Sequence, residues 1–134
     1  MYNVLEAVSF KIFGKPRPQK RPRVYKRKAI DPSAAEKQAF LMLAWGFKPE
    51  HPHTGPVYIE LEFGYLAKAR SADIDNLAKF VMDALNGTFY HDDRQITVLR
   101  AAKVIVQDDY TAVTIKYLSE NERKQEAPKG GKND

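Results

Sequence analysis

Apolar residues recur at two different spacings along the chain, and these spacings predict both strands and helices. Every second residue is apolar from Val8 to Ile12 within residues 2–13, and alternation returns over residues 57–66 and 110–118, with a further strand predicted over residues 96–106. Alternation of this kind is typical of strands with one buried face. After Asp73 the spacing changes to three and four residues, which predicts an amphipathic helix ending at Asn86-Gly87. Its apolar stripe is Ile74, Leu77, Ala78, Val81 and Leu85.

A second helix is predicted between Asp31 and Gly46. Asp31 is suited to the N-cap with Pro32 at the first helical position, and Gly46 and Pro49 would end the helix. Its buried stripe is expected at Ala35, Ala39, Met42 and either Leu43 or Trp45. The resulting order, β-α-β-α-β-β, predicts an α+β fold of two layers, with helices packed on a mixed sheet.

Two segments lack either periodicity. Residues 14–23 hold three prolines among several cations, which predicts a loop that is neither helix nor central strand. Residues 119–134 mix both charges with proline and glycine, which predicts a disordered tail. The interpretation is one domain over residues 1–118 and a charged tail over residues 119–134.

The composition limits the number of domains and excludes some kinds of metal site and cross-link. A chain of 134 residues fits a single domain. The absence of cysteine excludes disulfides and thiolate metal sites. No signal-like N-terminus and no apolar run of membrane-spanning length occur, so we expect a cytoplasmic protein without a membrane partner.

Positive charge is concentrated near the N-terminus. The formal net charge is +5, and no acidic residue interrupts the cations between Lys11 and Lys28. Such a field attracts nucleic acid or another anionic surface, although a basic protein with no special partner has the same net charge. The cations are Lys11, Lys15, Arg17, Lys20, Arg21, Arg23, Lys26, Arg27 and Lys28.

Carboxylates are concentrated in a different window, residues 73–93. Asp73 and Asp75 lie at the predicted helix start, and Lys79 follows one turn later. Asp92-Asp93 comes after the helix and one short loop, so we expect its carboxylates to return toward the helix start. Several carboxylates together can hold Mg²⁺, which suits phosphodiester cleavage. Ordinary roles stay open for each residue: an N-cap, a helix-dipole partner, an exposed ion pair and a polar turn.

Other polar residues are interpreted as structural. Asp108-Asp109 lies between two predicted strands and is expected to be a hairpin turn. Asp83 is expected to be solvated or structural, and His51 and His53 to be loop residues. His91, beside the acidic pair, is a minor candidate.

The spacing of these residues is similar to that of a known family. Asp73-x-Asp75-Asn-x-x-Lys79, then Asp83-Ala-Leu-Asn-Gly, then Asp92-Asp93-x-Gln-Ile and Lys103 resemble the RusA family of Holliday-junction resolvases. The upstream run of prolines and cations resembles a segment of its bacterial and prophage members. The resemblance implies a RusA-like fold and a homodimeric endonuclease that resolves four-way junction DNA in recombination and repair. It also implies Mg²⁺ as cofactor, with Mn²⁺ as a plausible substitute.

The resemblance assigns roles to individual residues. Asp73, Asp75 and Asp93 would bind the metal, Lys79 would assist catalysis, and Asp92 would be a secondary ligand. The residues expected to contact DNA are Lys15, Arg17, Lys20, Arg21, Arg23, Lys26 and Lys103. Two other functions stay open: a non-catalytic basic nucleic-acid-binding protein, and a related nuclease that acts on flaps or forks.

Overall fold

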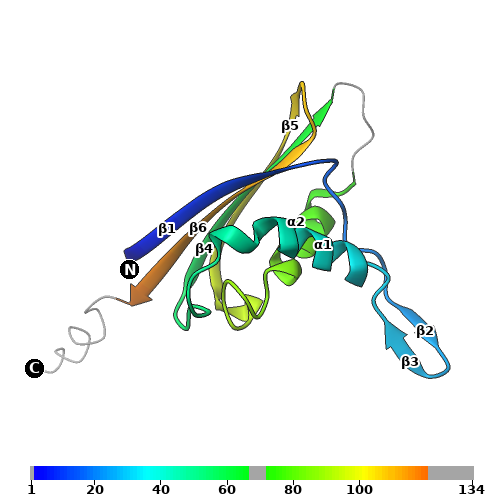
Figure 1. Cartoon of the computed structure of the whole chain (residues 1–134), viewed down its shortest axis with the longest axis horizontal. Helices are drawn as coiled ribbons and strands as arrows, with labels where there is room; N and C mark the ends of the chain where they lie inside the picture. Colours follow the sequence, from blue (N-terminus) through cyan, green and yellow to red (C-terminus); the bar gives the residue numbers. More distant parts are fainter. Residues whose placement is uncertain (1, 67–71, 121–134) are drawn as a thin grey trace, which may run out of the picture.

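Four long strands form one mixed sheet, and two helices cover one of its faces (Figure 1). The computed structural model describes residues 2–66 and 72–120. In order across the sheet, the strands are β1 (Tyr2–Phe13), β6 (Tyr110–Glu120), β4 (Val57–Leu66) and β5 (Ile96–Val106). β6 runs antiparallel to both of its neighbours, whereas β4 and β5 are parallel. The helices are α1 (Ala34–Ala44) and α2 (Ile74–Ala84). The predicted α+β class and the two layers are confirmed.

The core lies between β4 and the inner face of α2. Ile59, Leu61 and Phe63 on β4 are at most 1% exposed, as their alternation predicted. Leu77 and Val81 on α2 are equally buried. Each such side chain contributes roughly 1.5–3 kcal/mol by leaving water. This packing fixes α2 on the sheet, and with it the polar residues of its outer face.

The prediction for α1 was wrong about both its start and its buried face. The helix begins at Ala34, because Asp31 and Pro32 form a preceding turn in which the Asp31 carboxylate accepts a hydrogen bond from the Ser33 N–H at 2.9 Å. The buried side chains are Lys37, Phe40 and Ala44. All five residues of the predicted stripe, Ala35, Ala39, Met42, Leu43 and Trp45, are exposed. A short 3₁₀ helix, η1 (Trp45–Phe47), follows and ends the element near Gly46 as predicted.

A two-stranded ribbon, not predicted by the apolar pattern, follows the proline-rich segment. β2 (Arg23–Tyr25) and β3 (Lys28–Ile30) pair antiparallel and project from the body of the protein (Figure 1). Lys26 and Arg27 connect them, both with positive φ, at 49° and 65°. Two positive φ angles in a two-residue hairpin turn match the twist of the strands, and this geometry usually selects Asn and Gly. Two cations in this place are therefore unusual.

The connection that contains Asp108-Asp109 is not a hairpin turn, contrary to prediction. β5 and β6 are separated by β4, so the connection crosses the end of β4. The Asp109 carboxylate accepts a hydrogen bond from the Leu66 N–H at 3.0 Å, where β4 ends. The Asp109 carbonyl accepts another from Gly14 N–H, also at 3.0 Å. Asp109 therefore has the structural role expected of it, but in a crossover connection.

The last strand, β6, forms the C-terminal end of the described sheet. β6 extends to Glu120, two residues beyond the predicted end of the domain at residue 118. The rest of the predicted tail, residues 121–134, lies outside the described residues. No helix within residues 2–66 and 72–120 is long and apolar enough to cross a membrane.

Candidate active site

The start of α2 presents two carboxylates to solvent. Asp73 is the N-cap residue with extended backbone, and its carbonyl accepts the Leu77 N–H at 3.1 Å. Asp75 lies in the first turn, where its carboxylate accepts the Asn76 N–H at 2.9 Å. The helix dipole favours negative charge at this end. Both side chains are exposed, as is Lys79 one turn further along.

Two other segments reach this end of α2. Lys103 on β5 donates a hydrogen bond from Nζ to the carbonyl of Ala72, at 3.1 Å. In the proline-rich segment, the Gln19 N–H donates to the carbonyl of Asn76 at 3.0 Å. The structure thus places Asp73 and Asp75 between a cationic strand and the basic N-terminal segment.

Asp92 and Asp93 lie elsewhere, in the turn that leads into β5. Asp92 caps the 3₁₀ helix η2 (Asp93–Gln95): its carboxylate accepts the Arg94 N–H at 3.0 Å, and its own N–H donates to the side chain of Gln95 at 2.8 Å. The hydrogen bond from the Arg94 N–H is the largest cause that lowers the pKa of Asp92. Partial burial raises the pKa of Asp93, and the neighbouring carboxylates of Asp92 and Asp83 raise it further. Asp93 therefore belongs to the end of α2 that carries Asp83.

Asp93 does not come close to Asp73 and Asp75 within one chain. α2 has 11 residues, which separates its two ends by about 16 Å. The strand gives a similar result, since Lys103 marks the Asp73 end and lies seven residues, about 23 Å, along β5 from Ile96. Within the described residues, no three His, Asp or Glu side chains form a group that could hold a metal ion. The expectation that the short loop returns Asp92 and Asp93 to the helix start was wrong.

Asp73 and Asp75 nevertheless offer donors that suit a hard divalent cation. Mg²⁺ is commonly bound by one or two carboxylates, with water and phosphate oxygens completing its shell. The exposure of both side chains leaves room for those additional ligands. The start of α2 therefore supplies two of the ligands that such a cation needs.

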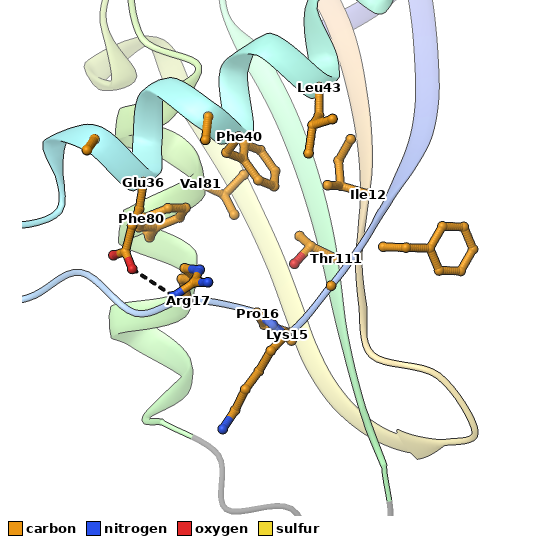
Figure 2. A pocket seen from close by; sticks show the side chains of 14 residues that line it. Ile12, Lys15, Pro16, Arg17, Glu36, Phe40, Leu43, Phe80, Val81 and Thr111 are labelled. Atoms are coloured by element: carbon orange, nitrogen blue, oxygen red, sulfur yellow. Dashed lines mark hydrogen bonds and ion pairs between the residues drawn. The ribbon is translucent and has the colours of Figure 1, made fainter.

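An acidic residue of α1 neutralises part of the charge of the basic segment. Arg17 pairs with Glu36 at 2.7 Å and Lys20 approaches the same carboxylate at 3.6 Å. Figure 2 shows Arg17 reaching Glu36 at the rim of an apolar hollow of about 380 Å³, while Lys15 points away from it. None of the candidate aspartates lines this hollow. The positive charge available from this segment is therefore smaller than the sequence suggested.

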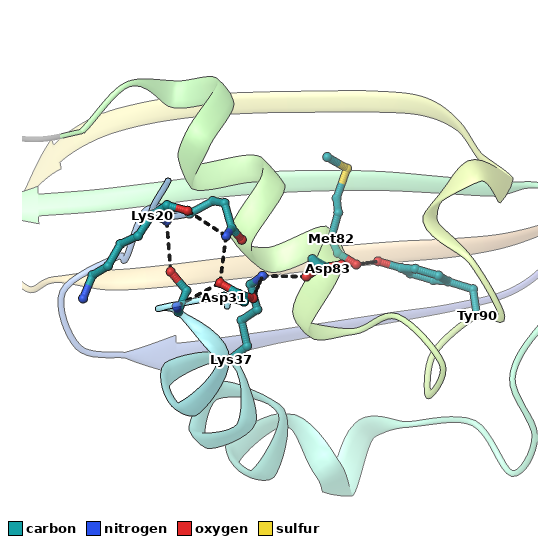
Figure 3. A network of polar contacts seen from close by, with 8 residues as sticks. Lys20, Asp31, Lys37, Met82, Asp83 and Tyr90 are labelled. Atoms are coloured by element: carbon teal, nitrogen blue, oxygen red, sulfur yellow. Dashed lines mark hydrogen bonds and ion pairs between the residues drawn. The ribbon is translucent and has the colours of Figure 1, made fainter. Parts of the chain in front are cut away.

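A buried lysine ties the base of the ribbon to α2. Lys37 lies between Asp31 at 2.7 Å and Asp83 at 2.5 Å (Figure 3). Desolvation alone would lower the pKa of Lys37, but the hydrogen bonds to Asp31 and Asp83 outweigh it and raise that pKa. The bond from Lys37 is also the largest cause that lowers the pKa of Asp31. Sequence reasoning missed Lys37, whose only signal was its spacing of three and seven residues from Phe40 and Ala44.

His53 has a structural role. Its Nε2 lies 2.9 Å from the carbonyl of Leu118, and its ring contacts Tyr117. The Gln95 side chain donates to the carbonyls of His53 and Gly55, at 2.7 and 2.8 Å. These bonds join η2 to the loop before β4 and thereby fix the position of Asp93.

The fold and the net charge of +5 define the class of small basic α+β proteins. The family model of the endodeoxyribonuclease RusA matches residues 14–116, and the chain belongs to this family of Holliday-junction resolvases. Membership indicates an endodeoxyribonuclease, a hydrolase that acts on DNA. A curated relative, Uncharacterized protein YqaN of Bacillus subtilis (strain 168), is 28% identical over 141 residues, covering 86% of this chain and 99% of the relative.

Proposed function

We propose that this protein resolves Holliday junctions by paired, Mg²⁺-dependent nicks during DNA recombination and repair. The observation that carries the proposal is the exposed pair Asp73 and Asp75 at the start of α2, in a chain of the RusA family. Lys79, one turn after Asp75, and Lys103, which bonds to the carbonyl of Ala72, would supply positive charge for a phosphodiester.

Each residue of the site has a separate task. Asp73 and Asp75 would hold the cation, and their position on a helix packed against β4 keeps them fixed relative to the sheet. When bound there, Mg²⁺ would polarise the scissile phosphate and favour deprotonation of the attacking water. Lys79 would stabilise the negative charge that develops on the phosphate oxygens. Lys103 would position the Asp73 end of α2 through its bond to Ala72, and would contact the DNA backbone.

Asp93 would complete the metal site from a second subunit. A single chain keeps Asp93 on the wrong end of α2, whereas a symmetric dimer can bring it to the partner's Asp73 and Asp75. A two-fold dimer then has two identical sites, as two symmetric cuts in a four-way junction require. Asp92, which caps η2, would support Asp93 and has a smaller role as ligand.

The basic segment and the ribbon would contact the phosphate backbone. Arg17 and Lys20 already share Glu36, so Lys15 and Arg21 are expected to contribute more. The ribbon turn adds two cations to this surface. Arg23 is expected to contact the DNA as well. Replacing Lys26-Arg27 by Asn-Gly would remove two cations and relieve two positive φ angles.

This double substitution tests whether the ribbon binds DNA, because its expected effects on junction affinity and on thermal stability have opposite signs. Junction affinity should fall and the slope of log K against log salt should shrink by about two, while thermal stability should rise because Asn and Gly suit the turn. Unchanged affinity at moderate salt would remove the ribbon from the DNA surface. A parallel fall in stability would show that the turn matters for folding.

The central experiment compares cleavage of a synthetic four-way junction with and without Mg²⁺. The wild type should cut symmetrically with Mg²⁺, more weakly or comparably with Mn²⁺, and not in a chelator. Asp75→Asn should bind the junction and fail to cut it. Asp108→Asn is the matched control, because Asp108 is an exposed aspartate outside the site. Full cleavage by Asp75→Asn would refute the metal assignment.

The two alternatives have distinct signatures in the same experiment. A non-catalytic binding protein would bind the junction but give no cleavage product at any metal concentration. A nuclease for flaps or forks would cut those substrates faster than the junction at matched salt. No structural observation favours either alternative over junction resolution.

A further inference from the structure

The apolar hollow beside Arg17 has the size and the lining of a ligand site. Its lining includes the buried side chains of Phe40 on α1 and of Phe80 and Val81 on α2 (Figure 2). The rings of Phe40 and Phe80 meet edge to face, with their centroids 6.0 Å apart. The volume of about 380 Å³ lies at the lower end of the range for small-ligand sites, roughly 300–1,000 Å³. One flat aromatic ring system can therefore enter the hollow.

The wall that α1 contributes is an exposed apolar stripe. Ala35, Ala39 and Leu43 follow one another at intervals of four residues, and all three line the hollow. All three are exposed, Leu43 at 62%. An exposed apolar patch beside a concave site commonly marks a place where a ligand or partner binds. The stripe that the spacing predicted to be buried is thus uncovered within the described residues, and a ligand in the hollow would cover it.

A buried acceptor without a donor lies in the same lining. Oε2 of Glu36 accepts a hydrogen bond from Arg17 at 2.7 Å, whereas Oε1 is 3.6 Å from Nζ of Lys20, beyond hydrogen-bond distance. Oε1 is buried and accepts no hydrogen bond within the described part of the chain. Leaving a buried acceptor unpaired is costly. A ligand that brings an N–H group to Oε1 would remove this cost.

The hollow opens close to the start of α2. The N–H of Gln19 donates to the carbonyl of Asn76 at 3.0 Å, and Asn76 adjoins Asp75. Arg17, which lines the hollow, precedes Gln19 by two residues, a distance of at most about 7 Å along the chain. Lys15 points away from the hollow (Figure 2), where it can meet a phosphate. A nucleotide held along the basic segment therefore has its base within reach of the hollow.

We propose that the hollow binds one unpaired base of the DNA, turned out of the stack, while the neighbouring phosphates lie along the basic segment. The proposal deepens the proposed function and rests on it, because DNA bound at the start of α2 is the ligand. Proteins that take a base out of the stack hold it between aromatic or apolar side chains and bond to its Watson–Crick edge. Each of the four bases has an N–H group on that edge, which Oε1 of Glu36 can accept.

The charges at the rim favour a nucleotide over an apolar partner. Arg17 and Lys20 share one carboxylate, that of Glu36, so the rim keeps a net positive charge. An apolar ligand would gain nothing from these cations and would leave Oε1 of Glu36 unpaired. A nucleotide supplies a flat apolar ring, an N–H group and a negative charge together. A paired base cannot enter the hollow, so the site would favour DNA in which a nucleotide is unpaired or easily unpaired.

The first experiment blocks the hollow chemically. The natural chain has no cysteine, so Ala39→Cys places a single thiol in the hollow, and alkylation with N-ethylmaleimide fills the space. Gln38→Cys is the matched control, because Gln38 is exposed on the same helix and does not line the hollow. Binding is measured in a chelator to single-stranded oligothymidylate and to an abasic strand of equal length, which has the same phosphates. Circular dichroism checks that both variants fold.

The unmodified variants should bind oligothymidylate about 5- to 150-fold more tightly than the abasic strand, the range expected for contact with one base. Alkylation of Ala39→Cys should remove most of this preference. It should leave the affinity for the abasic strand and its salt dependence unchanged, because the phosphate contacts remain. Alkylation of Gln38→Cys should change neither affinity. Oligothymidylate should also slow the alkylation of Ala39→Cys more than the abasic strand does.

Three results would overturn the proposal. One is equal affinity of the unmodified protein for both strands. Another is a preference for bases that survives alkylation of Ala39→Cys. An equal loss for both strands after alkylation would place the backbone at the hollow in place of a base. Alkylation without effect on either strand would belong to the second result, and would leave the hollow to a partner other than DNA.

A second variant tests the contact with Glu36, because its two expected effects differ in sign. Glu36→Ala removes a carboxylate from among cations, so the affinity for the abasic strand should rise. The same substitution removes the acceptor for the base, so the preference for oligothymidylate should fall. An equal gain in affinity for both strands would refute the contact between Glu36 and the base.

These measurements do not depend on cleavage. A protein that shows the preference for bases but never cuts DNA would keep the base site and refute the proposed function. A protein that cuts junctions, and whose preference survives alkylation of Ala39→Cys, would keep the proposed function and refute the base site.

Discussion

Subunit mixing offers a direct test of how the metal site is completed. The perturbation is a pair of variants, Asp75→Asn and Asp93→Asn, each of which removes one proposed ligand and should be inactive alone. The two ends of α2 lie about 16 Å apart, with Asp75 in its first turn and Asp93 close to Asp83 in its last turn, whereas two oxygens bound to one Mg²⁺ lie at most about 4 Å apart. A site assembled from one chain is therefore excluded by distance, and a site shared between chains makes a distinct prediction.

A mixed dimer contains one doubly damaged site and one intact site. The intact site combines Asp75 of the Asp93→Asn chain with Asp93 of the Asp75→Asn chain. Random exchange between equal amounts of the two chains gives about half mixed dimers, so roughly a quarter of the wild-type sites should be restored. Each restored dimer can nick only one strand, so nicked junctions should accumulate in place of resolved duplexes.

The assay follows nicking of a junction labelled on each arm, after unfolding and refolding of the mixed chains. Mixing Asp73→Asn with Asp75→Asn is the control, because both substitutions damage the same half of the site and no combination repairs it. Different affinity tags confirm that mixed dimers have formed. If verified mixed dimers of Asp75→Asn and Asp93→Asn cut no better than either parent, the shared site is refuted.

Two further predictions concern stability. Gly64→Ala should destabilise the protein by about 1–3 kcal/mol, because the new Cβ would lie 2.6 Å from the buried ring of Tyr110; Gly46→Ala, with no atom within 4 Å, should change the free energy of unfolding by less than about 0.5 kcal/mol. Lys37→Met should lower the free energy of unfolding at pH 7 by about 1–2 kcal/mol, less than for a fully buried pair because the Asp31 and Asp83 side chains are 36% and 43% exposed. The folded-state pKa of Asp31 lies below its ordinary 3.8, so this stabilisation is present above that pH and is lost as pH falls through the folded value. Urea unfolding at pH 7 and pH 3 measures the effect, and an equal loss at both pH values would contradict it.

The strands and α2 could be predicted because their two faces differ in polarity. In β4 every inward residue is apolar, and in α2 the stripe from Leu77 to Leu85 is buried as predicted. α1 lacks such a difference: Phe40, Leu41, Met42 and Leu43 are consecutive, so several faces of the helix are equally apolar. Which of them is buried depends on the packing against α2 and β1, and this packing is not encoded in the spacing.

The spacing of apolar residues could not predict the order of the strands in the sheet either. β5 and β6 are adjacent in sequence and joined by a short polar connection, which favoured a hairpin. In the structure β4 lies between them and pairs with both, parallel to β5 and antiparallel to β6. Alternation reports which face of a strand is buried, but says nothing about which strand lies beside it.

The prediction of the metal site had a similar limit: the sequence identified the residues but not the distances between them. Family spacing identifies Asp73, Asp75 and Asp93 as acids of one kind, and their closeness in sequence suggested one cluster in one chain. Most of the intervening residues, however, form α2, and a helix extends by about 1.5 Å for each residue along its axis. α2 therefore keeps Asp93 at the end opposite Asp73 and Asp75. The buried stripe of the same helix fixes Asp73 and Asp75 relative to the sheet. If all three bind one metal, as proposed above, Asp93 has to come from a second subunit.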